Sequence, residues 1–139
     1  MNDLEKKILF LGHRYKTFNP FTIAEKLNID VQFRPFKEEP KGNTINFLGR
    51  PIILISDEIK DSNERYFVCA HELGHALEHV EIQAFYIYSS KNKMGIEYEA
   101  NNFAKKLLQN FYVEEYGDLP KTYNELVTSL GFPENNKLY

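Results

Sequence analysis

The sequence predicts an α+β fold in which a small, mostly antiparallel sheet packs against helices. Helical periodicity opens the chain, three strand-like segments follow between residues 29 and 56, and a long segment with helical spacing begins near residue 61. A chain of 139 residues with 42% hydrophobic and 14% aromatic content can bury one core without disulfides or metal staples. We therefore expect a single domain over residues 1–139.

The first two elements are predicted to be helices. Apolar residues recur at helical spacing within residues 4–15. A second, short helix is expected over residues 21–27. Asn19 is a plausible N-cap for it, and Pro20 falls at the first helical position, where its missing N–H needs no partner.

Strands are expected next, over residues 29–33, 44–48 and 52–56. The first alternates apolar and polar residues, and the third is an apolar run suited to a central strand. Gly49 and Arg50 lie between the second and third segments and predict a turn there. Together these segments account for the small sheet.

Helices are expected to complete the domain. A long helix is predicted to begin at Asp61 or Ser62, and another to cover residues 95–108. Residues 91–93, Lys-Asn-Lys, mark an exposed loop between them. A C-terminal helical segment is expected over about residues 112–139.

The segment His71-Glu72-Leu73-Gly74-His75 has the spacing of a helical metal site. On a helix, His71 and His75 project from one face a turn apart, so both imidazoles can reach one ion. Glu72 lies beside that face, where it is free to take a proton from a water that the metal activates. The pattern is typical of a metallopeptidase. The alternative is a solvated helix that carries two histidines and an acid by coincidence.

Two small residues of this helix carry structural predictions. Gly74 is unfavourable in a helix by about 1 kcal/mol relative to alanine, so we expect a neighbouring strand or a substrate to approach closely there. A tolerated glycine without function is the alternative. Cys69 lies on an apolar stripe with Leu73 and Ala76, which predicts a buried residue rather than a reactive thiol. A single cysteine also excludes an internal disulfide.

A catalytic zinc site usually has three protein ligands and one open position. The same helix cannot supply the third ligand, because Glu78 and Glu81 occupy the positions where a longer motif has glycine and histidine. His79 lies two turns beyond His71, too far to share its ion. The third ligand must therefore come from elsewhere in the chain.

The predicted helix at residues 95–108 offers Glu97. Its stripe is apolar except for Glu97 and Asn101, and a buried charge needs a partner. Zinc would satisfy Glu97, while Asn101 one turn later could hydrogen-bond a ligand imidazole. Glu99 points away and is the alternative ligand. An acid that merely favours the helix dipole is another interpretation of Glu97.

These residues resemble the ImmA/IrrE family of zinc-dependent peptidases. The resemblance rests on the motif at residues 71–75, the segment Glu-Tyr-Glu-Ala-Asn-Asn-Phe-Ala at 97–104, and the segment at 19–29. It covers most of the first 108 residues and implies a minimal, zincin-like metallopeptidase domain. It implies that the zinc ligands are His71, His75 and Glu97. It also implies that Glu72 is the general base and that the Asn101 amide supports a ligand.

The sequence departs from the family pattern after this segment. The family helix commonly runs on into Leu-Leu-Met-Pro, whereas this chain has Leu107-Leu108-Gln109-Asn110. The exit from the helix is therefore not predicted by the resemblance. An oxyanion donor is also expected, but spacing assigns it to none of the tyrosines that flank the motifs, Tyr86, Tyr88 and Tyr112.

The resemblance implies an endopeptidase that hydrolyses a peptide bond in a specific intracellular protein, such as a helix-turn-helix repressor of a phage or mobile element. The alternative is an anti-repressor module that binds its partner, uses zinc for stability and cleaves little. A structural zinc site is normally closed by a fourth protein ligand, and His13 and His79 are poorly placed to supply one. That favours catalysis.

The resemblance to zincins also suggests where a peptide substrate would bind. In zincins an extended peptide commonly pairs with an edge strand above the metal. Residues 44–48 could be that edge, and a purely structural hairpin fits the same pattern. The choice between them depends on the order of the strands.

Charge and hydropathy exclude other classes of partner. A net charge of −3 lacks the basic footprint of a free-standing nucleic-acid-binding protein. Residues 22–31 contain a helix but not the recognition helix that a helix-turn-helix requires. No run approaches the length of a membrane span and the start is not a signal peptide. We therefore expect a cytoplasmic protein that contacts neither nucleic acid nor membrane.

Overall fold

The computed structural model describes residues 1–36, 39–78 and 90–134, with residues 90–93 described by their backbone alone. Helices and strands together confirm the predicted α+β fold. In chain order the elements are α1 (Asp3–Tyr15), α2 (Pro20–Lys26), β1 (Asp30–Arg34), β2 (Gly42–Phe47), β3 (Arg50–Ser56), the 3-10 helix η1 (Asp57–Ile59), α3 (Glu64–Glu78), α5 (Ser90–Tyr116) and α6 (Tyr123–Leu130).

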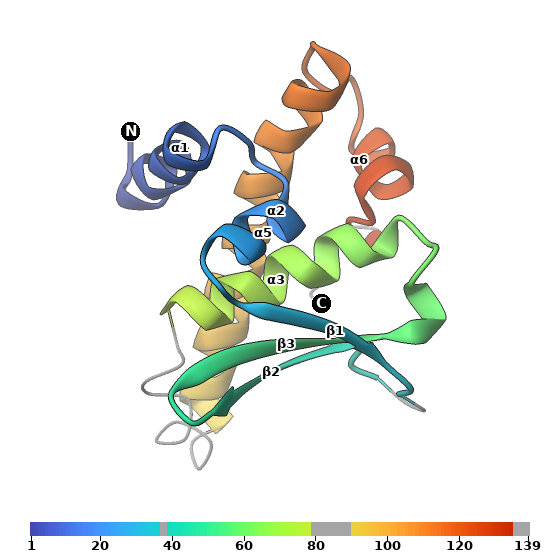
Figure 1. The fold of residues 1–139 in the computed structure, drawn as a ribbon. Helices are drawn as coiled ribbons and strands as arrows, with labels where there is room; N and C mark the ends of the chain where they lie inside the picture. Colours follow the sequence, from blue (N-terminus) through green and yellow to red (C-terminus); the bar gives the residue numbers. More distant parts are fainter. Residues whose placement is uncertain (37–38, 79–89, 135–139) are drawn as a thin grey trace.

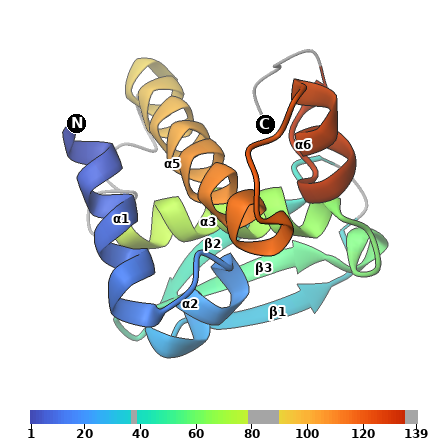
Figure 2. The same ribbon diagram turned by 90° about the horizontal axis from the view of Figure 1, so that it is seen from above.

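The sheet forms one layer and the helices form the other. Figure 1 shows the three strands below α3, and Figure 2 shows the labelled helices over the same face of the sheet. Helix α3 contacts β2, β3, α2 and α5, which makes it the centre of the core. Consequently every residue from Phe67 to His75 is buried, including the polar ones.

The strand order is β1-β3-β2, with β1 parallel and β2 antiparallel to β3. The apolar segment is therefore central, as predicted, and β2 is an edge strand. The expectation of a mostly antiparallel sheet was wrong, because the sheet is mixed. The chain reverses between β1 and β2 and again between β2 and β3, so β3 regains the direction of β1. Which strands then become neighbours is not encoded in any local pattern.

A two-residue turn joins β2 to β3. Its residues, Leu48 and Gly49, both have positive φ, 52° and 82°, as a type I′ turn requires. The turn lies one residue earlier than predicted, and Arg50 already belongs to β3, where it pairs with Phe47. The short turn sets the antiparallel register of the β2–β3 pair.

The two long helices differ from their predicted bounds. Helix α3 begins at Glu64, because η1 precedes it and the Ser62 hydroxyl accepts a hydrogen bond from the Glu64 amide at 3.1 Å. Helix α5 runs from Ser90 to Tyr116, so residues 91–93 are helical and the predicted loop there was wrong. The helix also continues through Gln109 and Asn110, since no proline stops it.

Close approach at Gly74 is confirmed, but its partner is a helix. A Cβ at Gly74 would lie 3.1 Å from Phe103 Cδ1 and 3.3 Å from Phe103 Cβ. Phe103 belongs to α5, so the glycine lets α3 and α5 pack closely. Cys69 is fully buried, as expected, and burial strongly raises the pKa of its thiol.

The C-terminal part of the described chain is helical. Residues 112–116 belong to α5, and α6 follows with Thr122 as its N-cap and Gly131, at φ 72°, as its C-cap. Residues 135–139 of the predicted C-terminal segment lie outside the described residues. Within the described ranges, none of the helices has the length and apolar character needed to cross a bilayer.

Candidate metal centre

Two helices bring the predicted site residues together. Helix α3 carries His71 and His75 one turn apart, with Glu72 directly after His71, and α5 presents Glu97 and Asn101 one turn apart against it. This follows from the close packing of α3 against α5 around Gly74. The site residues predicted from the sequence therefore all lie at or beside the contact between α3 and α5, although the chemical roles stay predictions.

The two imidazoles and the Glu97 carboxylate converge on one point. His71 Nε2 and His75 Nε2 lie 3.1 Å apart. Glu97 Oε2 lies 2.9 Å from His71 Nε2, and Glu97 Oε1 lies 3.0 Å from His75 Nε2. In the described part of the chain, these three residues form the group of ligand atoms that could hold a metal ion, all within 4.8 Å of one another.

The hydrogen bond on the far side of His71 indicates which ring nitrogen faces the candidate metal position. His71 Nδ1 lies 2.9 Å from Asn101 Oδ1, and an amide oxygen can only accept, so Nδ1 carries the proton. Nε2, on the opposite side of the ring, therefore faces Glu97 and His75. It is the ring nitrogen placed to act as a metal ligand.

The spacing also fits a small divalent ion. Two nitrogens bound tetrahedrally to zinc at about 2.0–2.1 Å lie roughly 3.3 Å apart, close to the 3.1 Å between the two Nε2 atoms. His71 and His75 are buried, whereas the side chain of Glu97 is 37% exposed. The cluster is therefore walled by protein on the α3 side and open beside Glu97.

Glu97 is an anionic ligand candidate. Burial by itself raises the pKa of its carboxyl, but hydrogen bonds and positive charge at His71 and His75 outweigh that effect and hold the pKa well below its usual value. Glu99, the alternative ligand, is exposed and does not belong to the group that could hold a metal. The structure therefore favours Glu97 over Glu99.

Glu72 lies beside the cluster without joining it. Its carboxylate is buried, and Oε1 accepts a hydrogen bond from the Thr44 hydroxyl at 2.8 Å. The other oxygen, Oε2, lies 3.9 Å from His71 Nε2. Burial raises the pKa of Glu72, and the neighbouring histidines and Thr44 offset only part of that rise. A buried carboxylate with a raised pKa beside a candidate metal site fits the predicted role of Glu72 as a general base, which stays a prediction.

Thr44 is the residue that sequence reasoning missed. It belongs to β2 and is almost fully buried, and its hydroxyl also lies 3.1 Å from the main-chain oxygen of Glu72. A polar residue at an inward position of a strand was the available signal. The signal was insufficient because Thr44 and Glu72 are 28 positions apart.

The other histidines, acids and tyrosines considered in the sequence either lie away from the site or fall outside the described residues. His13 is exposed on α1 and lies outside the metal group, as expected. Tyr112 lies three turns along α5 from Asn101, so it does not flank the site. Its hydroxyl lies 3.4 Å from Glu125 Oε2 of α6. Glu81, His79, Tyr86 and Tyr88 lie outside the described residues.

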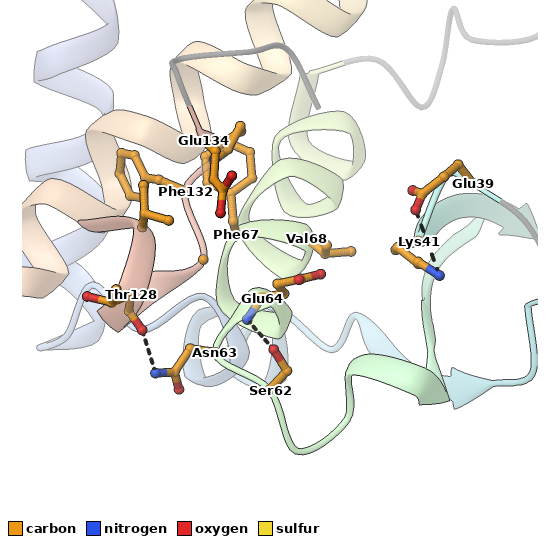
Figure 3. A pocket seen from close by; sticks show the side chains of 13 residues that line it. Glu39, Lys41, Ser62, Asn63, Glu64, Phe67, Val68, Thr128, Phe132 and Glu134 are labelled. Carbon is orange, nitrogen blue, oxygen red and sulfur yellow. Dashed lines mark hydrogen bonds and ion pairs between the residues drawn. The ribbon is translucent and has the colours of Figure 1, made fainter. Parts of the chain in front are cut away.

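A separate cavity of about 540 Å³ lies at the N-terminal end of α3. Figure 3 shows Val68 and Glu64 of α3 between Phe132, which follows α6, and Lys41, which precedes β2. None of the residues that could hold a metal lines it. Apolar and charged side chains both line this cavity, which lies apart from the candidate metal centre.

Comparison with known proteins finds a matching family and a similar phage protein. Residues 24–110 match the Peptidase_M78 family, described as the IrrE N-terminal-like domain. The match spans the sheet, the whole of α3, and α5 as far as Asn110. The chain is also 32% identical, over 124 residues, to the uncharacterized immunity region protein 2 of Bacillus phage phi105, covering 86% of this chain and 77% of that protein.

Proposed function

Because this chain belongs to the ImmA/IrrE family, whose peptidases depend on a metal, we propose that it is a zinc-dependent endopeptidase acting on a specific intracellular protein. The observation that supports this proposal best is that the candidate metal ligands and the candidate general base are separate side chains lying next to one another. His71, His75 and Glu97 converge on one point, while the buried carboxylate of Glu72 lies next to them and is held by another element.

The donor set supports zinc as the ion. Two imidazole nitrogens and one carboxylate form a three-ligand set that catalytic zinc sites use, with a position left for water or substrate. When bound, zinc would supply Lewis acidity, polarising the scissile carbonyl and making an attacking water more acidic. Asn101 keeps the His71 ring in the tautomer that offers Nε2 as a ligand.

The chain's own residues supply the proton transfers. Glu72 Oε2 faces the ligand side of the site, so it is the atom that takes a proton from the attacking water. The same oxygen can return that proton to the leaving amine. Burial raises the pKa of Glu72, which makes proton uptake easier than it is for a solvated carboxylate.

The edge strand β2 supports an extended peptide substrate. Its outer edge, on which no described strand pairs, lies beside the site, because Thr44 of β2 touches Glu72. An incoming strand can add to such an edge by main-chain hydrogen bonds. We propose a helix-turn-helix repressor of a phage or mobile element as the substrate. The family resemblance and the relative's name, an immunity region protein, support this choice. The activity requires no contact with nucleic acid or membrane.

The test uses the purified chain loaded with zinc and, as substrate, a purified helix-turn-helix repressor of a phage or mobile element. Wild-type protein should produce fragments that mass spectrometry can assign to one peptide bond. Glu72→Gln should retain zinc and lose at least about 1,000-fold in rate, because the general base is gone. Glu64→Gln, an exposed acid on the same helix, is the matched control and should cleave normally. Inactivation of the repressor by Glu72→Gln without fragments would instead identify a binding module that uses zinc for stability.

A further inference from the structure

Thr44 occupies two structural roles at once. Its side chain points inward to α3 and is 4% exposed, while its main chain belongs to the edge strand β2. Its Cα partner across the hairpin is Ile53 of β3. The residue therefore lies between the edge where a peptide would bind and the carboxylate proposed as general base.

The register of the hairpin shows where the main chain of Thr44 points. In an antiparallel pair, residues bonded to the partner strand alternate with residues whose N–H and C=O face away from it. Phe47 and Arg50 flank the two-residue turn, and Lys41 O accepts a hydrogen bond from Ser56 N at 2.7 Å. The odd-numbered residues of β2 are therefore the ones bonded to β3.

Thr44 consequently directs its N–H and C=O toward the outer edge of β2, on which no described strand pairs. Pro51 gives an independent check. It has no N–H, and it lies opposite Asn46, where the same alternation requires no hydrogen bond to β2. Gly42, Thr44 and Asn46 are thus the residues of β2 that offer main-chain groups to an incoming strand, and Thr44 is the one whose side chain contacts Glu72.

The hydroxyl of Thr44 determines how Glu72 is held. It lies 2.8 Å from Glu72 Oε1 and 3.1 Å from the Glu72 main-chain oxygen. Engaging Oε1 leaves Oε2 as the oxygen on the side of His71, 3.9 Å from its Nε2. Packing does not need this hydroxyl, because valine has the same shape. The oxygen is therefore present for its hydrogen bond.

We propose that Thr44 is a positioning residue that couples main-chain capture of the substrate to the orientation of Glu72. A peptide strand that pairs with Thr44 N–H and C=O is held by the same residue that aims Glu72 Oε2 at the attacking water. The substrate class is then an extended segment recognised through its backbone near the scissile bond. This inference rests on the proposed peptidase function.

The central experiment compares zinc-loaded wild-type protein with Thr44→Val and Thr44→Ser on a fluorogenic peptide selected from a random library. Thr44→Val should lower kcat about 10- to 100-fold, the effect expected for losing one hydrogen bond to a charged group, with KM and zinc content unchanged. Thr44→Ser should restore most of the rate. Equal losses in both variants, or a loss of zinc in Thr44→Val, would overturn the assignment.

Thr17 provides a matched control. Its hydroxyl donates to Glu114 Oε2 at 2.7 Å on α5, on the exposed surface, so Thr17→Val removes the same kind of bond away from the site and should leave kcat unchanged. Thr44→Ala is measured in parallel, so that a folding defect in the valine variant does not decide the outcome. A fall in kcat with Thr17→Val equal to that with Thr44→Val would contradict the proposal.

A readout without catalysis separates this inference from the proposed function. In the metal-free protein, the fall in Tm caused by Thr44→Val should be clearly smaller in a Glu72→Ala background, because the carboxylate partner is then absent. Additive Tm shifts would show that the two side chains are uncoupled and would sink the proposal. If Glu72→Gln stops hydrolysis but Thr44→Val does not slow it, this inference fails while the peptidase function stands.

The main-chain part of the proposal is tested on the peptide. Methylating its backbone amides one at a time removes single donors and blocks strand pairing at that position. One or two methylations next to the scissile bond should raise KM about tenfold or more, as expected for a lost, buried hydrogen bond. Uniform tolerance of methylation would exclude capture by the edge of β2.

Discussion

Asn101 shows how one residue can set the chemistry of a ligand that it supports. Its side-chain oxygen accepts from His71 Nδ1, so the opposite nitrogen of the ring is left for a metal. The side-chain nitrogen of Asn101 is buried and has no hydrogen-bond partner among the described residues. The Asn101 amide thus leaves one buried N–H donor without a partner among the described residues. This cost indicates that the site requires the Asn101 oxygen as the acceptor for His71 Nδ1.

At this scale we predict the effect of Asn101→Ala and Asn101→Asp on zinc affinity. Removing the partner of a ligand imidazole typically weakens metal binding about 10- to 100-fold, so Asn101→Ala should do so. Asn101→Asp keeps an acceptor of the same shape and should bind zinc at least as well as wild-type protein. Competition with a fluorescent chelator measures both, and equal weakening in the two variants would contradict the role of the oxygen.

The α3–α5 pair is the element on which the site depends. Two of its ligand candidates come from α3 and one from α5, so their separation is set by how closely the helices pack. Gly74 allows that packing, because Phe103 of α5 occupies the space where a side chain would begin. The glycine of the motif thus has a structural reason that is independent of substrate.

Gly74→Ala should therefore destabilise the protein, although alanine is the better helix former. The added methyl meets Phe103, whose side chain is 1% exposed and has little room to move. Overpacking of this kind costs about 1–3 kcal/mol, more than the roughly 1 kcal/mol gained in propensity. Denaturant unfolding measures the difference. Gly95→Ala on α5, where nothing lies within 4 Å, should instead be neutral or stabilising, and Phe103→Leu should relieve the effect of Gly74→Ala.

The molecule as a whole is two layers held together around α3. The sheet lies on one side of that helix and α5 packs on another, so a metal bound between α3 and α5 would tie the central helix to its long neighbour. Binding a cation at the cluster should therefore be visible in the stability of the entire domain.

Zinc should raise Tm, and chelation should lower it. A ligand at 100 times its dissociation constant stabilises the folded state by about 2.7 kcal/mol, which corresponds to roughly 5–15 °C for a domain of this size. Calorimetry of chelator-treated and zinc-loaded protein measures this shift. Glu97→Ala should abolish most of it, whereas Glu99→Ala should leave it intact. A full zinc-dependent shift in Glu97→Ala would refute Glu97 as a ligand.

Local patterns in the sequence predicted most of the helical and strand residues and the members of the cluster, but not the start of α5 or its extension to Tyr116. Periods of 3.6 and 2 residues, the spacing of His71 and His75, and a lone acid with an amide on an apolar stripe are all short-range signals. Strand order, the parallel β1–β3 pair and the contact between Thr44 and Glu72 are not short-range. They arise when segments distant in sequence share one core, and only the tertiary structure decided that β1 runs parallel to β3 and which hydroxyl reached the buried carboxylate.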